Sequence, residues 1–262
     1  MTSRARLVVV GGGNMGTALV AGLVASGWEP ATITVVEIDP GKRASLERDL
    51  GVRTSESAVA ADGAIVAVKP GDVPDVVADL AALGTPRIVS IAAGVLLATL
   101  EASAGNAAVV RAMPNTPALV REGVTAIAGG VRCTDDDMEW ADEVLSAVGT
   151  VVRVPESQMD AVTAVAGSGP GYLFLVAEAL LDAALAEGLP RPTADALVRQ
   201  LFRGAGALLA ASDESPATLR ERVTSPNGTT AAGLAEFENA RLRETVNKAV
   251  RAAAARSAEM GR

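Results

Sequence analysis

The sequence predicts an α/β fold in two parts, a doubly wound parallel sheet with its helices followed by an all-α domain. In the first part, short β-branched apolar runs alternate with helical patterns, which is the order that βαβ units produce. After Pro155 the β-branched runs stop, and alanine-rich helical periodicity continues to Arg262. The predicted domains are therefore residues 1–154 and 155–262.

The predicted sheet begins with the apolar run at residues 7–10, after which a helical pattern opens at Met15. Further strands are predicted at 32–38, 64–68, 87–91, 107–112, 124–128 and 150–154, and helices at 72–83, 95–104 and 135–147. In the second part, helices are predicted at 158–165, 171–188, 192–211 and 215–222, and from the loop at 224–230 to the C-terminus. Pro170 suits the first turn of one of these helices, and Gly188 ends it.

The stretch LVVVGGGNMG at residues 7–16 joins a strand to a helix through a glycine turn. Gly11 allows the tight turn, Gly13 lets the backbone approach a pyrophosphate, and Gly16 lets the helix lie close to the strand. The free N–H groups at the start of the helix favour an anion. The context on both sides therefore predicts a Rossmann-type dinucleotide site in the N-terminal domain.

Acidic and basic residues at the end of the second predicted strand bear on the choice of dinucleotide. Glu37 lies about 20 residues beyond the glycine turn, where an acidic side chain takes the ribose 2′-hydroxyl of NAD and repels the 2′-phosphate of NADP. Lys42 and Arg43 follow closely and are able to receive that phosphate. Alternatively, these residues form only a solvated loop, so the pattern leaves the choice open.

Two more strand ends are candidates for ligand contact, because strand ends of a parallel sheet line its ligand crevice. Lys69 and Pro70 follow the strand at 64–68, and we expect Lys69 to face a ligand rather than only solvent. Two prolines flank Asn115 and Thr116 and fix an extended loop after the strand at 107–112.

Composition excludes several classes of function. A net charge of −8 disfavours nucleic acid and anionic membranes as partners. Cys133 is the only cysteine, which indicates a reducing compartment, and we expect a cytoplasmic protein without a signal peptide or an apolar span of about 20 residues. The chain has no histidine, which removes histidine bases and histidine-rich zinc sites, and no metal site is predicted.

The loop at residues 224–230 is the second candidate binding site. Its hydroxyls, from Ser225, Thr229 and Thr230, gather beside a predicted helix N-terminus, and hydroxyls with free N–H groups suit a carboxylate or a phosphate. An ordinary capped helix start is the alternative, and spacing leaves both open. The surrounding helices carry small residues on more than one face, which favours a dimerisation domain over a compact helical cap.

Taken together, the chain resembles the Δ1-pyrroline-5-carboxylate reductases over nearly its whole length. The matching motifs are VVVGGGNMG (8–16), AVKPGDV (67–73), SIAAGV (90–95), RAMPNTPALV (111–120), AVTAVAGSGPGY (161–172) and TSPNGTTAAGL (224–234). The resemblance implies a Rossmann domain, a helical domain that interlocks two subunits, and decamers built from such dimers. It also implies hydride transfer from NADPH, with NADH possible, to the C=N bond of pyrroline-5-carboxylate, which gives L-proline.

The resemblance also assigns residues to the two sites. For the cofactor these are Gly11, Gly13, Asn14, Met15 and Gly16, with Val68, Lys69, Pro70 and Ala93 on the nicotinamide side. For the substrate they are Ser225, Gly228, Thr229 and Thr230. Thr230 is the expected catalytic residue, which donates or orients a proton, and Tyr172 is a second candidate donor.

The chain departs from the family pattern at three positions. Asn227 and Arg241 stand where the family usually has glycine, and Gly171 stands where it usually has alanine. Because Asn227 adjoins the substrate loop, a reductase of a different cyclic imine is an alternative. Hydroxy-acid dehydrogenases with a catalytic lysine fit less well, since Lys248 is the lone lysine after residue 158. A non-catalytic dinucleotide sensor would not need the hydroxyl loop.

Overall fold

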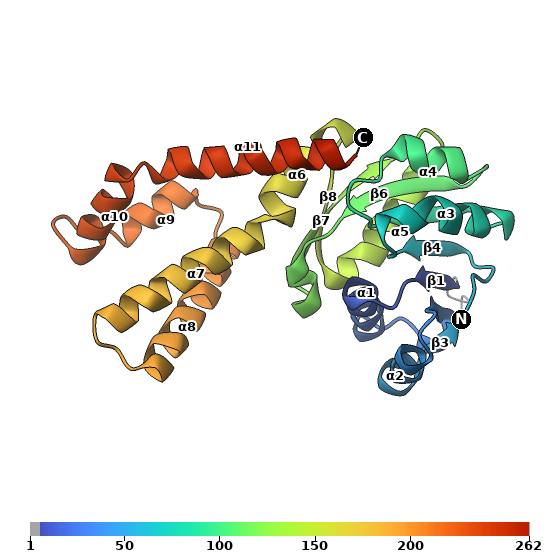
Figure 1. The fold of residues 1–262 in the computed structure, drawn as a ribbon, viewed down its shortest axis with the longest axis horizontal. Coiled ribbons are helices and arrows are strands. Elements are labelled where there is room, and N and C mark those ends of the chain that lie inside the picture. Colours follow the sequence, from blue (N-terminus) through green and yellow to red (C-terminus); the bar gives the residue numbers. More distant parts are fainter. Residues whose placement is uncertain (1–5, 262) are drawn as a thin grey trace. The chain divides into compact units, whose positions relative to one another are not determined.

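The computed structural model describes residues 6–261 and divides the chain into two compact units (Figure 1). The first unit comprises Met1–Ser168 together with Ala253–Arg262, and the second comprises Gly169–Ala252. This division lies beyond the boundary at residue 154 that the sequence predicts, for reasons that the packing of the first unit makes clear.

The first unit is built on one eight-stranded sheet, ordered β3-β2-β1-β4-β5-β6-β7-β8. Its strands are β1 (Leu7–Val10), β2 (Ile33–Val36), β3 (Arg53–Ser55), β4 (Gly63–Val66), β5 (Arg87–Ser90), β6 (Ala108–Met113), β7 (Gly123–Gly129) and β8 (Gly149–Arg153). The chain winds outward from β1 to β3, returns to pair β4 with β1, and winds outward again. This is the predicted doubly wound fold, with a topological switch between β1 and β4.

One pair of strands contradicts the prediction of a fully parallel sheet. β6 and β7 are antiparallel, with Met113 opposite Ala126, whereas every other pair in the described sheet is parallel. The connection at residues 114–122 is shorter than the crossover of about a dozen residues that parallel strands need. The proline-flanked loop therefore acts as a hairpin connection and reverses the chain.

Helices cover both faces of this sheet. They are α1 (Asn14–Ala25), α2 (Pro40–Leu50), α3 (Val73–Ala82), α4 (Leu97–Ser103), α5 (Asp135–Leu145) and α6 (Met159–Val162). Leu7 and Val9 of β1 join the apolar cluster that holds α1, α2 and α5, and Val8 and Val10 join the cluster that holds α3 and α4. Because the strand is buried on both faces, it is continuously apolar rather than alternating.

Local capping explains where two of these helices begin. The Asp39 side chain accepts hydrogen bonds from the N–H groups of Gly41 and Lys42 and so caps α2, a helix whose bounds the sequence did not predict. Thr134 and Asp137 form a reciprocal capping box at the start of α5. β3 was also missed in prediction, because a three-residue polar edge strand has no apolar pattern.

Residues 155–168 pack within the first unit, which moves the boundary. Met159 is fully buried in the apolar cluster of α3 and α4. Glu156 Oε1 accepts hydrogen bonds from Leu97 N (2.7 Å) and Arg111 Nη1 (2.9 Å). Ser257 Oγ donates to Asp160 Oδ1 at 2.7 Å, which ties the C-terminal turns to the same unit. These long-range contacts leave no mark in local composition.

The second unit consists of helices with little core of their own. They are α7 (Gly169–Ala186), α8 (Arg191–Ala210), α9 (Pro216–Arg222), α10 (Thr229–Asn239) and the first part of α11 (Leu242–Met260). Within residues 169–252, all of which the structure describes, Ala194 is the one fully buried apolar residue. Large exposed apolar side chains include Leu173, Phe174, Leu175, Leu197, Leu201, Phe237 and Val246.

The helical stretch Glu156–Ala186 is long, apolar and weakly buried. It has a mean hydropathy of 1.4 in its apolar window and is long and apolar enough to cross a membrane by length and composition, with 11% of that window buried. The expectation was that no uninterrupted apolar span of about 20 residues exists, and Glu178 and Asp182 do interrupt this stretch. A weakly buried apolar helix of this kind also suits contact with a second protein chain.

Two glycine-to-alanine substitutions in helices are expected to act in opposite directions. A Cβ on Gly22 of α1 would lie 2.6 Å from both Ala147 O and Val148 Cγ1, so Gly22→Ala is expected to lower the free energy of unfolding by about 1–3 kcal/mol. At Gly171 of α7 a Cβ meets nothing within 4 Å, so Gly171→Ala is expected to add up to about 0.5 kcal/mol through helix propensity. Differential scanning calorimetry measures both. Equal melting temperatures for the two variants would contradict this account of α1 packing.

Candidate functional site

A cavity of about 700 Å³ lies at the carboxyl ends of the strands in the first unit, where the strand order switches. Five of the predicted cofactor residues line it, namely Gly11, Gly13, Glu37, Val68 and Lys69. The remaining lining residues are Val10, Val36, Ile38, Glu56, Ser57, Ala58, Ala67, Asp72, Val76 and Asp79. Ligands of doubly wound sheets bind in the crevice at this position.

The glycine turn forms one wall of the cavity. Gly11 has a φ of 109°, and a Cβ there would lie 2.5 Å from Ala67 O. A Cβ on Gly16 would collide with the carbonyl oxygen of Gly11, so glycine at both positions lets α1 pack closely against β1 and β4. A Cβ on Gly13, by contrast, meets nothing within 4 Å, which leaves the backbone there open to a ligand.

The first turn of α1 fits an anion. Gly13 is the N-cap residue and offers no side-chain cap, so the first N–H groups of the helix lack an intrahelical acceptor. Asn14 is exposed and Met15 half-buried in this turn, and Gly16 is buried beneath it. The open glycine cradle and the uncapped helix start together suit the pyrophosphate of a dinucleotide, which would bind here in front of α1.

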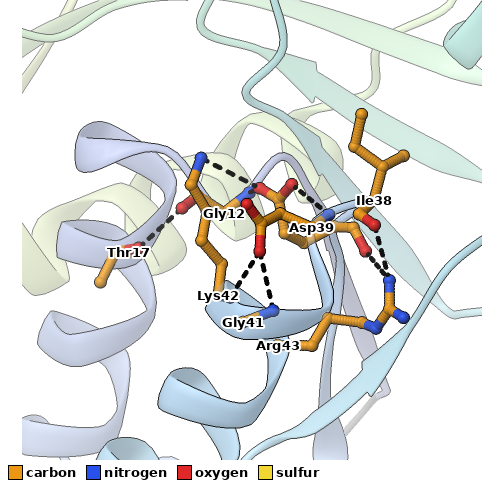
Figure 2. A network of polar contacts seen from close by, with 8 residues as sticks. Gly12, Thr17, Ile38, Asp39, Gly41, Lys42 and Arg43 are labelled. Atoms are coloured by element: carbon orange, nitrogen blue, oxygen red, sulfur yellow. Dashed lines mark hydrogen bonds and ion pairs between the residues drawn. The ribbon is translucent and has the colours of Figure 1, made fainter.

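Glu37 is held at the end of β2 by the backbone. Its carboxylate is 9% exposed, and its two oxygens accept hydrogen bonds from Gly12 N and Asp39 N, each at 3.0 Å. Lys42 Nζ lies 3.9 Å from Glu37 Oε2 on the solvent side. Figure 2 shows this network, in which Thr17 Oγ1 of α1 donates to Gly12 O, and the Glu37 carboxylate links Gly12 to Asp39 and Lys42 at the start of α2.

Two other charged groups of the network are also committed to the backbone. Arg43 Nη1 donates to the carbonyl oxygens of Glu37 (2.7 Å) and Ile38 (3.0 Å). The N–H groups of Lys42 and Gly41 lower the pKa of the Asp39 carboxyl from its usual value. Asp39 therefore stabilises α2 at neutral pH, and this contribution is lost as the pH falls through the lowered pKa.

Four of the predicted cofactor residues lie outside the lining of the cavity, in addition to Gly16. Asn14 and Met15 belong to α1, and Pro70 begins the short 3₁₀ turn Pro70–Asp72 that precedes α3. Ala93 lies in the turn after β5, next to Gly94, whose φ is 78°. Conversely, the sequence analysis missed the lining residues that follow β3 and those of α3. The residues after β3 had one available signal, their position just after a strand, and those of α3 had none.

The MPNTP loop is fixed by its asparagine. Asn115 is 9% exposed, its Oδ1 accepts a hydrogen bond from Val124 N (2.9 Å), and its Nδ2 donates to Ala166 O (3.1 Å). Ala166 belongs to a π-helical turn at Thr163–Gly167, and such turns are frequent at functional sites. Asn115 thus joins the hairpin connection to the segment that leads into α7.

In the second unit, the hydroxyl loop meets the start of α10 as predicted. Gly228 is the N-cap residue and again provides no side-chain cap, so the first N–H groups of α10 are free. Ser225, Thr229 and Thr230 are exposed around this start. A Cβ on Gly228 would collide with Ser225 Oγ, which explains glycine there. The arrangement can receive a carboxylate.

Tyr172, the second candidate donor, lies in the first turn of α7. Its hydroxyl is buried and has no hydrogen-bond partner among residues 6–261. A buried hydroxyl without a partner is uncommon, so this group is available to a ligand or to another chain.

Comparisons with known proteins match different family models to the N-terminal and C-terminal parts of the chain. Residues 156–260 match the family model described as pyrroline-5-carboxylate reductase dimerisation. Residues 6–94 match the model described as NADP oxidoreductase, coenzyme F420-dependent. The first match begins one residue beyond the predicted start of the helical domain. It covers the helices that leave their apolar side chains exposed.

Relatives that match nearly the whole chain are also named pyrroline-5-carboxylate reductases. A pyrroline-5-carboxylate reductase of Synechocystis is 42% identical over 263 residues, which cover 98% of each chain. The solved structure of a pyrroline-5-carboxylate reductase from Coxiella burnetii matches with a TM-score of 0.94 and 35% identity over 99% of this chain and all of that one. The Plasmodium falciparum enzyme, solved with NADP bound, matches with a TM-score of 0.86 and 28% identity over 99% of each chain. Sequence, fold and site geometry therefore agree: this chain belongs to the pyrroline-5-carboxylate reductase family.

Proposed function

We propose that this chain reduces the C=N bond of 1-pyrroline-5-carboxylate with a reduced nicotinamide dinucleotide and so forms L-proline, the last step of proline biosynthesis. The observation that supports this most directly is the uncapped start of α10 among the hydroxyls of Ser225, Thr229 and Thr230. A dinucleotide cradle alone would suit many oxidoreductases. A second, separate anion site with hydroxyls suits a small substrate that carries a carboxylate.

The cofactor is assigned to the first unit. When bound, the reduced nicotinamide supplies the hydride. The glycine turn and the first turn of α1 hold the pyrophosphate, and Val68, Lys69, Pro70 and Ala93 are proposed for the nicotinamide side. The family resemblance implies NADPH, and NADH is the alternative that the contacts of Glu37 favour.

The substrate is assigned to the second unit. The free N–H groups of α10 and the Ser225 and Thr229 hydroxyls hold the carboxylate, and Gly228 leaves room for the ring. Their role is orientation, because a hydride acceptor must be held in line with its donor. Hydride transfer requires the bound cofactor and the bound substrate to come into contact in the active assembly.

Thr230 is proposed to serve the imine nitrogen. That nitrogen must carry a proton to accept hydride readily, and the chain has no histidine to provide one. The Thr230 hydroxyl is exposed at the start of α10 and has no hydrogen-bond partner among the described residues. A threonine hydroxyl is a weak acid, so we assign it to holding the protonated nitrogen or a water beside it.

The active assembly is proposed to be a homodimer formed through the helical unit, with a decamer of such dimers as the larger assembly that the resemblance implies. The apolar side chains of α7 and α8 provide the surface for the second copy. We propose a cytoplasmic enzyme, in keeping with the single cysteine and the negative net charge.

The activity is tested by the loss of reduced-nicotinamide absorbance with pyrroline-5-carboxylate, run in parallel with NADPH and NADH. Turnover with either cofactor supports the proposal. If the protein binds a reduced cofactor but does not turn over, the substrate is another cyclic imine or the protein is a dinucleotide sensor, and other cyclic imines are then assayed.

Thr230→Ala is expected to lower kcat/KM for the imine by on the order of tenfold to a hundredfold, because the imine nitrogen loses its hydroxyl partner. Thr230→Ser, which keeps the hydroxyl, is expected to recover most of the activity. Thr245→Ala removes a hydroxyl of α11 whose one hydrogen bond among residues 6–261 is to Arg241 O, and it serves as the control. Wild-type kinetics for Thr230→Ala would remove this residue from the mechanism.

The backbone conformation of Asn227 leads to a second testable prediction. Asn227 has a φ of 59°, in the left-handed region that glycine and asparagine tolerate and β-branched residues avoid. Asn227→Gly is therefore expected to leave KM for the imine nearly unchanged. Asn227→Val is expected to cost the loop about 1–2 kcal/mol and to raise this KM up to about tenfold, with the cofactor KM unaffected. Steady-state kinetics that show equal KM values for the two variants would argue against a role for the loop in substrate binding.

A further inference from the structure

We propose that Glu37 makes this chain select NADH over NADPH. The inference rests on the proposed function only in taking a reduced nicotinamide dinucleotide as the ligand. It assigns to one carboxylate the specificity that the sequence pattern left open, and it follows from how the structure commits each charged group around the end of β2.

The Glu37 carboxylate is fixed in place by the backbone. It is 9% exposed and lines the cavity, and its two oxygens hold the N–H groups of Gly12 and Asp39 at 3.0 Å. Rotation away would leave two backbone donors without an acceptor, one of them in the glycine turn itself. A fixed negative charge therefore stands beside the cradle.

The Glu37 carboxylate can still accept further hydrogen bonds from a ligand. Each carboxylate oxygen can accept more than one hydrogen bond, and each oxygen of Glu37 has one backbone donor among the described residues. The remaining acceptor sites suit ribose hydroxyls, which are donors. They do not suit a 2′-phosphate, which presents only acceptor oxygens and negative charge at neutral pH.

The two cations near Glu37 already have partners. Arg43 Nη1 is used by the carbonyl oxygens of Glu37 and Ile38, its Nη2 faces Glu56 at 4.0 Å, and its side chain is 21% exposed. Lys42 faces Glu37 at 3.9 Å with 55% of its side chain exposed, so its charge is largely screened by water. Arg43 is therefore engaged by the backbone and Lys42 is paired with Glu37 itself, so both cations that sequence spacing made candidates for a phosphate site already have partners.

The cavity wall as a whole carries a net negative charge. Among the lining residues that the structure describes, Glu37, Glu56, Asp72 and Asp79 are acidic, and Lys69 is the single cation. A second phosphate on the adenosine ribose would enter a field of the same sign. Exposed carboxylates contribute weakly, which leaves the buried Glu37 as the determinant.

Binding of NADH and of NADPH to the purified full chain is measured by isothermal titration calorimetry without substrate. A chain that binds but does not turn over therefore still reports on Glu37. The wild type is expected to bind NADH at least about tenfold more tightly than NADPH. Glu37→Gln, which keeps the shape, loses the charge and can accept from only one of the two backbone N–H groups, is expected to bring the two dissociation constants within about threefold of each other.

Glu56→Gln is the matched control, because Glu56 also lines the cavity but its side chain is 77% exposed. It is expected to leave the ratio of the two dissociation constants within about twofold of wild type. Equal or tighter binding of NADPH by the wild type overturns the proposal. An unchanged ratio in Glu37→Gln, or an equal effect of Glu56→Gln, also overturns it.

A salt series on the wild type keeps the test independent of how Glu37→Gln folds. Between about 0.05 M and about 0.5 M salt, screening weakens charge interactions at the cavity. If Glu37 repels the 2′-phosphate, the preference for NADH narrows as salt rises. If Lys42 or Arg43 receives that phosphate instead, salt weakens NADPH binding selectively and the ratio moves the other way, which overturns the proposal.

Discussion

The first unit depends on one close approach of backbone to backbone. Gly11 and Gly16 let the turn after β1 pass beneath the start of α1 and against β4, where a Cβ would collide with a carbonyl oxygen at either position. That approach leaves the N–H of Gly12 facing β2, where Glu37 accepts it. The cavity, the uncapped helix start and the fixed carboxylate all follow from the absence of side chains in this turn.

Local sequence was sufficient for the parts of the fold that local chemistry determines. The glycine turn, the apolar strands and the proline at the start of α7 were predicted correctly because each is specified within a few residues. The antiparallel pairing of β7 with β6 and the boundary between the two units were not predicted. They depend on the length of the connection at 114–122 and on contacts such as that of Ser257 with Asp160, which are distant in sequence.

In the candidate site, too, the local sequence predicted some features and not others. Sequence spacing located Glu37, Lys42 and Arg43 together but could not show which groups the backbone would engage. Two departures from the family pattern gain a common explanation from backbone angles. Asn227 and Arg241 replace the usual glycine and have φ values of 59° and 54°, so each adopts the conformation for which glycine is favoured.

The thin core of the second unit has a consequence for how this protein behaves on dilution. Residues 169–252 bury almost no large apolar side chain within one chain, so most of the hydrophobic stabilisation of α7 and α8 has to come from another molecule. Folding of this unit is then linked by mass action to protomer concentration. Its melting temperature becomes a property of the solution as well as of the sequence, and the rate of unfolding after dilution is set by how fast the partner dissociates.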